Sequence, residues 1–426
     1  MKHSHFFNHY LTSVLIIIIQ LTSSNTYGQV IGCTDPLALN YNAATTVNNG
    51  SCTYAVTTYQ AALKIDTLND ALKETSGLQM AGGFLWTIND GGDSAVIYRI
   101  DTIKNEILQR VILEGAQNID WEDIGFDGSY FYIGDFGNNL NGARTDLKIY
   151  KFPFGAIPNH AVNNSATIPA VLIQVINFSY SDQPQPPQPS PNNFTKFDCE
   201  AMIIDDGKIH LFTKDWVTLS TTHYVIADTA AGTYTASPVE TLATNYLVTA
   251  ADKATGQNIV VLLGYQNSGA ANHFIHFLSE YSGEKYFNGN KRRLDLPNVL
   301  YMGQAEGVAF RNGFYGYISN EQFERQISPT QVLTVTAKLR SFAIDNFIAN
   351  SGTIYHFTGN GNWDLASNWE QNMMPPTILL GGSEIIIDPV TGGKCILNIP
   401  YTVTAGCILT VKPGKELVLN KGIIMN

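Results

Sequence analysis

Short apolar runs, each bounded by polar residues and a glycine-containing turn, recur along most of this chain. Residues 121–139 read WEDIGFDGSYFYIGDFGNN, which is an acidic start, an apolar strand, a turn, a second apolar strand and a polar end. The same plan recurs at residues 75–93, 199–216 and 305–323, and more loosely at 248–266. Copies spaced about 50 residues apart indicate a repeat architecture in which each copy is one supersecondary unit.

Each hairpin is followed by further β-rich runs before the next copy begins. The third runs are VIYRIDTI, LKIYKFPF, THYVIADT, HFIHFLSE and VLTVTAKL, and the fourth runs include EILQRVIL, VLIQVINF and the weaker VETLATNY. Four strands per copy are typical of a β-propeller blade. We therefore predict an all-β chain with a five-bladed β-propeller. A stack of two-layer sandwiches is the rival fold, and the fixed polar start of each hairpin argues against it.

Two segments outside the repeats complete this picture. AALKIDTL at residues 61–68 precedes the first hairpin and has no unit of its own, so we expect it to pair with the last blade and close the ring. The long interval between Glu122 and Glu200 contains SDQPQPPQPSPNN, whose prolines exclude a central strand and predict a projecting loop. A sixth blade remains an alternative if this insertion hides a degenerate copy.

The composition supports a folded β protein and excludes some partners. Apolar residues make up 44% of the chain and charged residues 14%, with 36 Gly, 21 Tyr and 21 Phe. This composition suits short strands joined by tight turns. The net charge of -11 comes without a long basic block, so the electrostatic signature of a nucleic-acid-binding protein is missing.

The N-terminus has the layout of an export signal. Residues 1–28 carry a lysine, the apolar run LTSVLIIIIQL and a polar stretch that ends in a small residue. The apolar run is shorter than the roughly 20 residues of a transmembrane helix, and no later run approaches that length, so the mature chain is expected to lack a transmembrane segment. We divide the chain into a signal peptide (1–28), a small disulfide-stapled module (29–56), a β-propeller (57–348) and a C-terminal β-rich module (349–426).

The cysteines fit an oxidising compartment, where disulfides persist. Cys33 and Cys52 would staple the small N-terminal module, and Cys395 and Cys407 would clip neighbouring strands near the C-terminus. Cys33 also follows a weak lipoprotein-like VIG sequence, which leaves lipidation as an alternative. Cys199 is left over in an apolar run, where a buried free thiol is the favoured interpretation over a nucleophile.

Polar residues gather where the blade topology brings two chain segments together. The second strand of a blade returns to the face on which the first begins, so the starts of the first strands meet the ends of the second. Glu122, Glu200 and Glu306 share the start position, with Asp252 near it in the looser copy and Ser76 in another. The second-strand ends supply a larger set: Asn89, Asp90, Asp93, Asp135, Asn138, Asn139, Lys214, Asp215, Asn320 and Glu321.

This convergence predicts a polar, acidic mouth of the propeller channel. The predicted ligand-binding residues are Glu122, Asp123, Glu200, Glu306, Asn89, Asp90, Asp135, Asn139 and Asp252. Carboxylate and amide oxygens are ligands that calcium prefers, so calcium is the candidate cofactor, with Glu122, Asp135, Glu200 and Glu306 as its ligands. The alternative is that each residue only caps a loop or shapes a turn.

No nucleophile constellation stands out, and the catalytic residues are unknown. His210, His223, His273 and His276 lie within strand-like runs, where packing is their expected role. Zinc-ligand spacing, a G-x-S-x-G elbow and a phosphate-binding glycine loop do not occur in suitable context.

Three segments resemble known families. Residues 32–54, from GCTDP to GSCTY, resemble a small repeat of secreted bacterial surface proteins, which implies an extracellular adaptor. The WEDI, GDFGNN, DCEAM and TAAD hairpins resemble those of exported bacterial propellers described as phytase-like or esterase-like, and Asn138 stands where these often carry Asp. The GNWDLASNW segment near residue 361 resembles the start of a stalk module of bacterial surface proteins.

The resulting functional prediction is an exported or cell-surface propeller that binds a ligand or partner through its acidic channel face without catalysis. Its partner would be an extracellular ligand or a surface component. The alternative is a calcium-dependent phosphoesterase or esterase-like hydrolase at the same face. The expected location is secreted or cell-surface, or the periplasm if the chain lacks a sorting tail.

Overall fold

The computed structural model describes residues 29–425, apart from 255–256, 269–270, 312, 345, 350–353, 376, 380–382 and 404–406. The signal peptide expected at residues 1–28 lies outside the described residues. The described chain is mostly β-structure, as predicted, with one short helix, α1 (Val299–Met302). Brief 3-10 turns make up the rest of its helical content: η1 (Asp70–Leu72), η2 (Phe154–Ala156), η3 (Ala170–Leu172), η4 (Tyr286–Asn288), η5 (Ala366–Asn368) and η6 (Glu370–Asn372).

The hairpins expected from the sequence pattern all form, and their first strands line a ring. The hairpins are β4 (Thr75–Ala81) with β5 (Phe84–Asn89), β8 (Trp121–Phe126) with β9 (Tyr130–Asp135), β13 (Cys199–Asp205) with β14 (Lys208–Thr213), β17 (Leu247–Lys253) with β18 (Ile259–Tyr265), and β21 (Gln304–Phe310) with β22 (Tyr315–Glu321). The first strands contact one another in the cyclic order β4, β8, β13, β17, β21 and back to β4.

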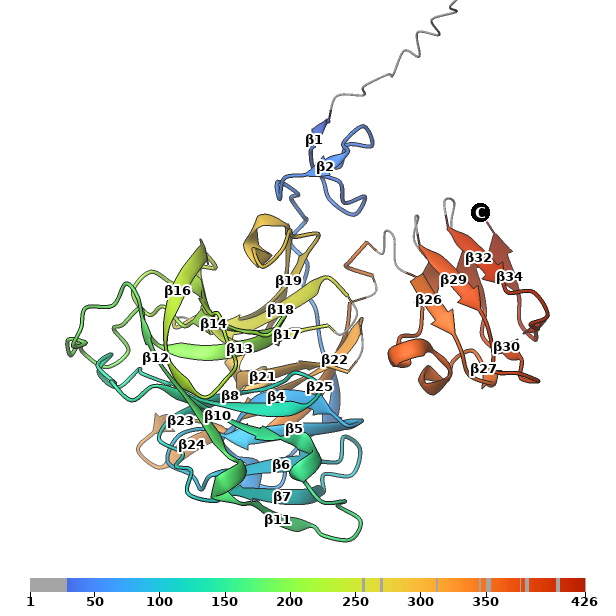
Figure 1. Ribbon diagram of the computed structural model, residues 1–426. Helices are drawn as coiled ribbons and strands as arrows, with labels where there is room; N and C mark the ends of the chain where they lie inside the picture. The colour runs from blue at the N-terminus through green and yellow to red at the C-terminus, as the bar shows by residue number, and fades with distance from the viewer. Residues whose placement is uncertain are drawn as a thin grey trace, which may run out of the picture.

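Outer strands extend each hairpin into a sheet. They are β6 (Val96–Ile100) and β7 (Ile107–Leu113), β10 (Lys148–Pro153) and β12 (Gln174–Tyr180), β15 (Thr221–Ile226) and β16 (Gly232–Leu242), β19 (Asn272–Ser279) and β20 (Asn290–Asn298), and β25 (Lys338–Ala343) with β3 (Ala62–Ile65). Sheets arranged around a closed ring of inner strands form a β-propeller (Figure 1).

The strand β3 closes the ring as predicted. It pairs antiparallel with β25, with Ile65 opposite Leu339 and Leu63 opposite Arg340. The N-terminal side of the propeller therefore supplies the outer strand of its last sheet. Ile65 is buried in the core between the last sheet and the first, together with Leu72, Leu78 and Leu339.

The last sheet departs from the prediction in one respect. VLTVTAKL was expected to be its third strand, but residues 331–335 form β24 (Gln331–Val335), which pairs with β23 (Phe323–Ser328) in a separate hairpin. The third strand is β25. Most of β23 and β24 is exposed, so this hairpin lies outside the last sheet instead of extending it.

The long interval between Glu122 and Glu200 contains more than the proline-rich loop. β11 (Ser165–Ile168) leaves its own sheet and adds a parallel fifth strand beside β7 of the first sheet. Further along, β12 pairs in parallel with β16, and this pairing joins two neighbouring sheets into one eight-stranded sheet. The proline-rich residues 181–193 form the expected loop between β12 and β13.

The N-terminal module is held by the predicted Cys33–Cys52 disulfide. It contains only β1 (Ile31–Gly32) and β2 (Val47–Asn48), paired in parallel. Its contacts with the propeller are polar: Thr34 Oγ1 donates to Glu280 Oε2 at 2.5 Å, and Lys291 Nζ donates to the Gly50 carbonyl at 3.2 Å.

The C-terminal module is a coil of parallel strands. Its three sheets are β26 (Ile354–Phe357), β29 (Glu384–Ile387) and β32 (Ile408–Val411); β27 (Gly361–Asn362), β30 (Cys395–Leu397) and β33 (Leu417–Leu419); and β28 (Ile378–Leu379), β31 (Tyr401–Val403) and β34 (Ile423–Met425). Every pairing in these sheets is parallel, which is the pairing of a coil and not of an antiparallel sandwich. Trp363 and Trp369 of the GNWDLASNW segment pack against each other in its core, with ring centroids 4.8 Å apart.

The predicted Cys395–Cys407 disulfide does not form in the described structure. Cys395 is a buried thiol in β30, and burial raises its pKa to about 12. Cys407 precedes β32, which belongs to a different sheet, and its Sγ donates to the Leu379 carbonyl at 3.3 Å. The coil therefore places the two sulfur atoms on separate sheets. Cys199 is the buried free thiol that we predicted.

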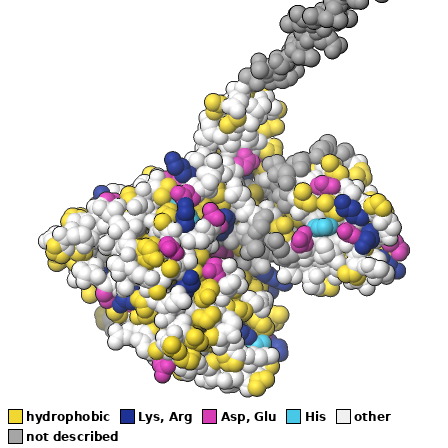
Figure 2. Space-filling model, in the orientation of Figure 1, with side chains coloured by type: hydrophobic (Ala, Val, Ile, Leu, Met, Phe, Trp, Pro, Cys, Tyr) yellow, Lys and Arg dark blue, Asp and Glu magenta, His cyan; other side chains and the backbone are white. Residues whose placement is uncertain are grey.

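Within the described residues, no helix has the length and apolar character needed to cross a membrane. On the face of the molecule shown in Figure 2, acidic and basic side chains are interspersed over the propeller. This distribution agrees with the absence of a basic block in the sequence.

Candidate functional site

An irregularity of the inner strands positions the acidic side chains. Register shifts in the inner hairpins place an extra residue at the start of each first strand: Ser76 with Gly77 in β4, Glu122 in β8, Glu200 in β13, Thr249 in β17 and Glu306 in β21. A β-bulge leaves its extra residue out of the regular pairing and re-aims its side chain. The recurrent polar start in the sequence therefore corresponds to a recurrent bulge at one end of the channel.

The second-strand ends lie beside these bulges, as the hairpin register requires. Asn89 is paired with Thr75, Asp135 with Trp121 and Glu321 with Gln304. The structure consequently brings together the carboxylates of residues from several blades. We call this group the acidic funnel: Asp90, Asp120, Glu122, Asp198, Glu200, Glu306 and Glu321.

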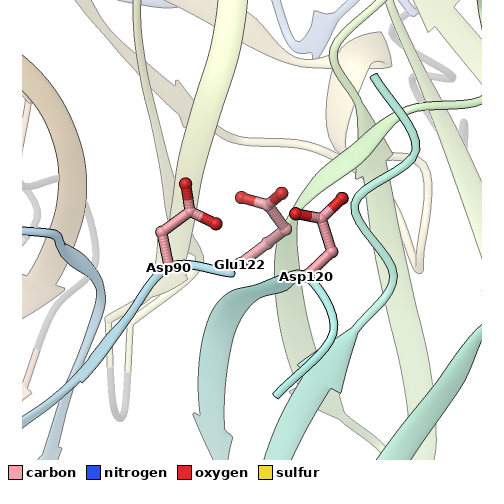
Figure 3. A group of neighbouring side chains, drawn as sticks. All are labelled: Asp90, Asp120 and Glu122. Carbon is pink, nitrogen blue, oxygen red and sulfur yellow. The ribbon is translucent and has the colours of Figure 1, made fainter. Parts of the chain in front are cut away.

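Two groups of carboxylates within the funnel are close enough to share a metal ion. In the Glu122 cluster, ligand atoms of Asp90, Asp120 and Glu122 lie within 4.8 Å of one another. Figure 3 shows these three carboxylates side by side, reaching in the same direction from their loops and strand. In the Glu306 cluster, ligand atoms of Asp90, Glu306 and Glu321 likewise lie within 4.8 Å of one another. Asp90 belongs to both clusters.

Glu122 is the most unusual member of the funnel. It is only 3% exposed, yet its carboxylate has no hydrogen bond and no ion pair within the part of the chain that the structure describes. Burial raises its pKa well above the usual range, and the neighbouring Glu200, Asp90 and Asp120 carboxylates raise it further. A buried carboxylate without a partner is strongly disfavoured unless it is protonated or binds a cation.

The neighbours of Glu122 share this perturbation. Burial, followed by repulsion from Glu306, raises the pKa of Asp90 to about 7. Burial, followed by repulsion from Asp198, raises the pKa of Asp120 to about 6. The Glu122 cluster thus holds carboxyl groups that resist ionisation near neutral pH, which is the expected signature of a site that needs positive charge.

Lys214 neutralises another part of the funnel. This lysine follows β14 and is 3% exposed; its Nζ lies 2.9 Å from Glu200 Oε2 and 3.8 Å from Glu306 Oε1. The ammonium group also lies over the rings of Trp216 and Tyr265, 5.0 and 5.4 Å from their centroids. Burial alone would lower the pKa of Lys214, but Glu200, Tyr265 and Glu306 outweigh it and raise the pKa well above its usual value.

Asp135, which we predicted as a metal ligand, is held instead in an ion pair. Its Oδ1 lies 2.8 Å from an Arg144 guanidinium nitrogen, and the side chain is fully buried. Arg144 also donates to the Gly137 carbonyl at 2.8 Å. Asp135 also lies outside both clusters of mutually close carboxylates, so the structure does not bring the four predicted metal ligands together as one set.

The remaining predicted residues fall into different environments. Asn89 donates to the Ala71 carbonyl and to Asp93, which fits the turn-forming alternative. Asn139 lines a cavity of about 620 Å³ that opens above Lys214, Trp216 and Tyr265 on the funnel side. Asp123 accepts from the backbone N–H of Met202 at 2.7 Å, which fastens β8 to β13.

The placement of Asp252 corrects the sequence alignment. Thr249, not Asp252, occupies the bulge of β17. Asp252 lies farther along the strand, where it accepts from the Phe310 N–H at 2.6 Å, and it lines a cavity with the glycine turns at Gly82, Gly128 and Gly207. Because the hairpin turns lie at the opposite end of the inner strands, Asp252 belongs to the other mouth of the channel.

Glycine residues make room for the Glu122 cluster. A Cβ atom on Gly137 would overlap Glu122 Oε1 and lie 2.5 Å from Asp120 Oδ2. A Cβ atom on Gly91 would lie 2.6 Å from Asp120 Oδ1. The glycines of NDGGD and GDFGNN therefore let the backbone approach the carboxylates closely, in addition to forming turns.

Sequence reasoning missed two members of these clusters as ligands. Asp120 precedes the bulged strand by one residue, and its position next to the Trp121-Glu122-Asp123 triplet was the available signal. Glu321 was recognised as a second-strand end but was not selected. Its pKa is raised well above the usual range by burial and then by Glu306 and Asp90, which identifies it as part of the same electrostatic unit.

The strand histidines serve packing, as expected. His210 and His223 face each other across β14 and β15, with Nδ1 and Nε2 2.9 Å apart, and His276 accepts from or donates to the Tyr246 hydroxyl at 2.7 Å. Burial raises the pKa of the Cys199 thiol, which is the opposite of what activates a nucleophile.

Comparisons with known proteins yield distant structural neighbours. No protein-family model matches the chain, and no curated protein matches it. The PQQ-bound aldose sugar dehydrogenase of Streptomyces coelicolor aligns with a TM-score of 0.36 and 11% identity over 66% of this chain and 97% of its own. A putative 6-phosphogluconolactonase of Bacteroides uniformis ATCC 8492 aligns with a TM-score of 0.30 and 12% identity over 60% of this chain and 68% of its own.

A chain of the mitotic checkpoint complex aligns with a TM-score of 0.28 and 12% identity over 57% of each chain. At these TM-scores the likenesses carry no argument about function. The assignment of a β-propeller rests on the strand pairing and the closed ring of inner strands in this structure.

Proposed function

We propose that this chain is an exported or cell-surface five-bladed β-propeller that binds an extracellular ligand or surface component through the acidic funnel, with a divalent cation, best matched by calcium, held at the Glu122 cluster. The cyclic order of five inner strands supports the blade count. The Cys33–Cys52 disulfide supports an oxidising location outside the cytoplasm.

The observation that carries the proposal is the state of Glu122. A side chain 3% exposed, close to Asp90 and Asp120, has only like charges as strong electrostatic neighbours. A bound divalent cation would remove the repulsion among the three carboxylates and replace the hydration that each lost on burial.

The donor set favours calcium over softer metals. The Glu122 cluster offers only carboxylate oxygens, which hard cations prefer, whereas zinc sites in proteins are usually built with His or Cys. Calcium also accepts irregular geometry and six to eight oxygen ligands, so carboxylates from separate loops can serve it without a preformed octahedron.

A binding role is favoured over catalysis by the chemistry of the funnel. The members of the acidic funnel are all carboxyl groups, and the neighbouring Lys214 is already engaged by Glu200. The strand histidines His210, His223, His273 and His276, together with Cys199, are packed within the sheets. The cavity that opens above Lys214, Trp216 and Tyr265 offers space for a ligand near the proposed cation.

Calcium titration followed by calorimetry and thermal unfolding tests the proposal. A ligand that binds only the folded state raises the unfolding midpoint, so the wild-type protein should unfold at higher temperature in millimolar calcium. Glu122→Gln should weaken calcium binding at least tenfold, because it removes a charged ligand. The exposed Glu106→Gln is the matched control and should bind like the wild type.

An absence of calcium binding by the wild-type protein would refute the cation part of the proposal. A panel of chromogenic phosphate and acyl esters, assayed with calcium present, tests the non-catalytic role. Turnover that disappears in Glu122→Gln and persists in Glu106→Gln would favour a calcium-dependent hydrolase instead.

A further inference from the structure

Lys214 divides the acidic funnel into two electrostatically different halves. Its ammonium group lies between Glu200 and Glu306, at 2.9 and 3.8 Å, and therefore reaches one member of the Glu306 cluster. In the described structure, no Lys, Arg or His forms an ion pair with any member of the Glu122 cluster. The two clusters share Asp90, yet only one of them has a positive charge within ion-pair distance.

The ammonium group is fixed in this position from several sides. Trp216 and Tyr265 present their ring faces to Nζ, and Trp216 is itself held by a hydrogen bond of 2.7 Å from its Nε1 to Asp198 Oδ2. Gln304 donates to Glu306 Oε1 at 2.8 Å, which orients the more distant carboxylate of the pair. Lys214 is 3% exposed, so it lacks the freedom to move into solvent when another cation arrives.

We infer that Lys214 is a built-in cation that determines how many metal ions the funnel takes, by reserving the Glu306 cluster so that a single divalent cation binds at the Glu122 cluster. This inference rests on the proposed cation site. It assigns Lys214 a role in ion specificity and stoichiometry, through repulsion of a second divalent ion from Glu306 and Glu321.

The consequence is that removal of the lysine charge creates a second site. Without the ammonium group, Asp90, Glu306 and Glu321 have ligand atoms within 4.8 Å of one another and no compensating charge, which is the present condition of the Glu122 cluster. Glu200, released from Lys214, adds a further carboxylate near this position.

Calorimetric titration with calcium, using metal-free protein, measures the stoichiometry. The wild-type protein should bind one ion in the funnel, Lys214→Met should bind two, and Lys214→Arg, which keeps the charge, should bind one. Adding Glu321→Gln to Lys214→Met should return the stoichiometry to one, because it removes a ligand of the second site only. A purely structural role for Lys214 would change stability without raising the number of ions bound.

The outcomes separate this inference from the proposed function. A wild-type protein that binds no calcium overturns the proposed cation site. A wild-type protein and a Lys214→Met variant that both bind one ion overturn the role of Lys214 and leave the cation site standing. If Lys214→Met does not fold, the double variant Lys214→Met with Glu200→Gln removes the lysine together with its nearest partner. Our inference requires that this double variant also binds a second ion.

Discussion

At the residue scale, the acidic funnel depends on how closely backbone and carboxylates approach each other. Gly137 precedes the polar end of the second hairpin, and the space beside its Cα is filled by the Glu122 and Asp120 side chains. Its backbone N–H also donates to the Asp120 carbonyl at 3.2 Å. A glycine that the sequence pattern assigns only to a turn is therefore a steric requirement of the site.

Gly137→Ala should displace Glu122 and Asp120 and weaken calcium binding. Forcing a methyl group into a packed position also costs about 1–3 kcal/mol of the free energy of unfolding. Gly155→Ala is the matched control, because a Cβ atom at Gly155 meets nothing within 4 Å. Calorimetry and urea unfolding of both variants check the prediction, and equal calcium affinity in the two would contradict it.

Buried histidines give the fold a dependence on pH of a defined sign. Burial, with Arg293 and Lys291 nearby, lowers the pKa of His276 to about 3, and the Tyr246 hydroxyl is its hydrogen-bond partner. Burial also lowers the pKa of His210 and of His273 to about 4. These side chains take up protons in the unfolded chain near pH 6.5 but not in the folded chain, so they destabilise the fold as the pH falls from about 6.5 towards 4.

His276→Gln should reduce this acid destabilisation. Each buried histidine contributes a slope of about 1.4 kcal/mol per pH unit in the free energy of unfolding over this window, and the variant lacks one such contribution. Urea unfolding at pH 7, 6 and 5 measures the slope. The wild-type protein measured under the same conditions gives the reference slope. Identical slopes for the variant and the wild type would count against this account.

At the element scale, the ring is closed by a strand that precedes all the hairpins. β3 supplies the outer strand of the last sheet, and Ile65 inserts into the core between that sheet and the first, where it is 6% exposed. Leu63, two residues earlier, points outward and is 49% exposed. Residues two apart on a regular strand share a face, so this difference reflects the register shift between Leu339 and Arg340, which leaves Lys64 as an extra residue in β3.

Ile65→Ala should destabilise the propeller by about 2–5 kcal/mol, since it removes a buried branched side chain and leaves a cavity. Leu63→Ala, at an exposed position of the same strand, should change the free energy of unfolding by about 0.5 kcal/mol or less. Urea unfolding followed by tryptophan fluorescence compares the two. A similar loss for both variants would show that β3 does not seal the ring.

The elements that the sequence predicted well are those whose pattern is local. Alternating apolar residues on either side of a glycine turn predict a hairpin from local sequence alone, and the structure contains every hairpin that was expected. Residues 331–335 were misassigned because an exposed hairpin and a buried strand have the same alternation, and only packing distinguishes them. Asp252 was misplaced because the looser copy carries Thr249 at the start position, and its first acidic residue lies three positions farther along the strand.

The sequence predicted where the acidic residues gather but not which of them form ion pairs. The convergence of bulged residues and second-strand ends follows from blade topology, which the sequence repeats indicate. Blade topology does not predict which carboxylates become neutralised. Lys214, which follows β14, meets Glu306 of β21, two places further round the ring, and Arg144 reaches back across its own loop to Asp135. Such pairings depend on side-chain reach in three dimensions.

At the scale of the whole molecule, hydrogen bonds and a cation–π contact of Arg292 with Tyr54 attach the N-terminal module to the propeller. Asn48 donates to Asn290 at 2.9 Å and Thr34 donates to Glu280, while the module itself is closed by Cys33 and Cys52. A unit of this size cannot build a sufficient apolar core, so the disulfide supplies much of its stability.

Cys33→Ser with Cys52→Ser should unfold the module and leave the propeller intact. A disulfide that closes a loop of this length contributes about 3 kcal/mol to the free energy of unfolding. So small a module cannot lose this much stability and remain folded. Limited proteolysis should therefore cleave the variant within residues 29–56, while its calcium affinity and the main unfolding transition stay at wild-type values. Loss of calcium binding would show that the module supports the funnel.

The parallel pairing of β12 with β16 makes the junction between these two blades different from the other junctions in the ring. The other blades of the described propeller form separate sheets, but here backbone hydrogen bonds run continuously from β8 to β13 through eight strands. Contiguous hydrogen-bonded regions tend to open as one cooperative unit in amide exchange. Slow-exchanging amides of these two blades should accordingly be released together, and fraying of the ring should begin at the other seams.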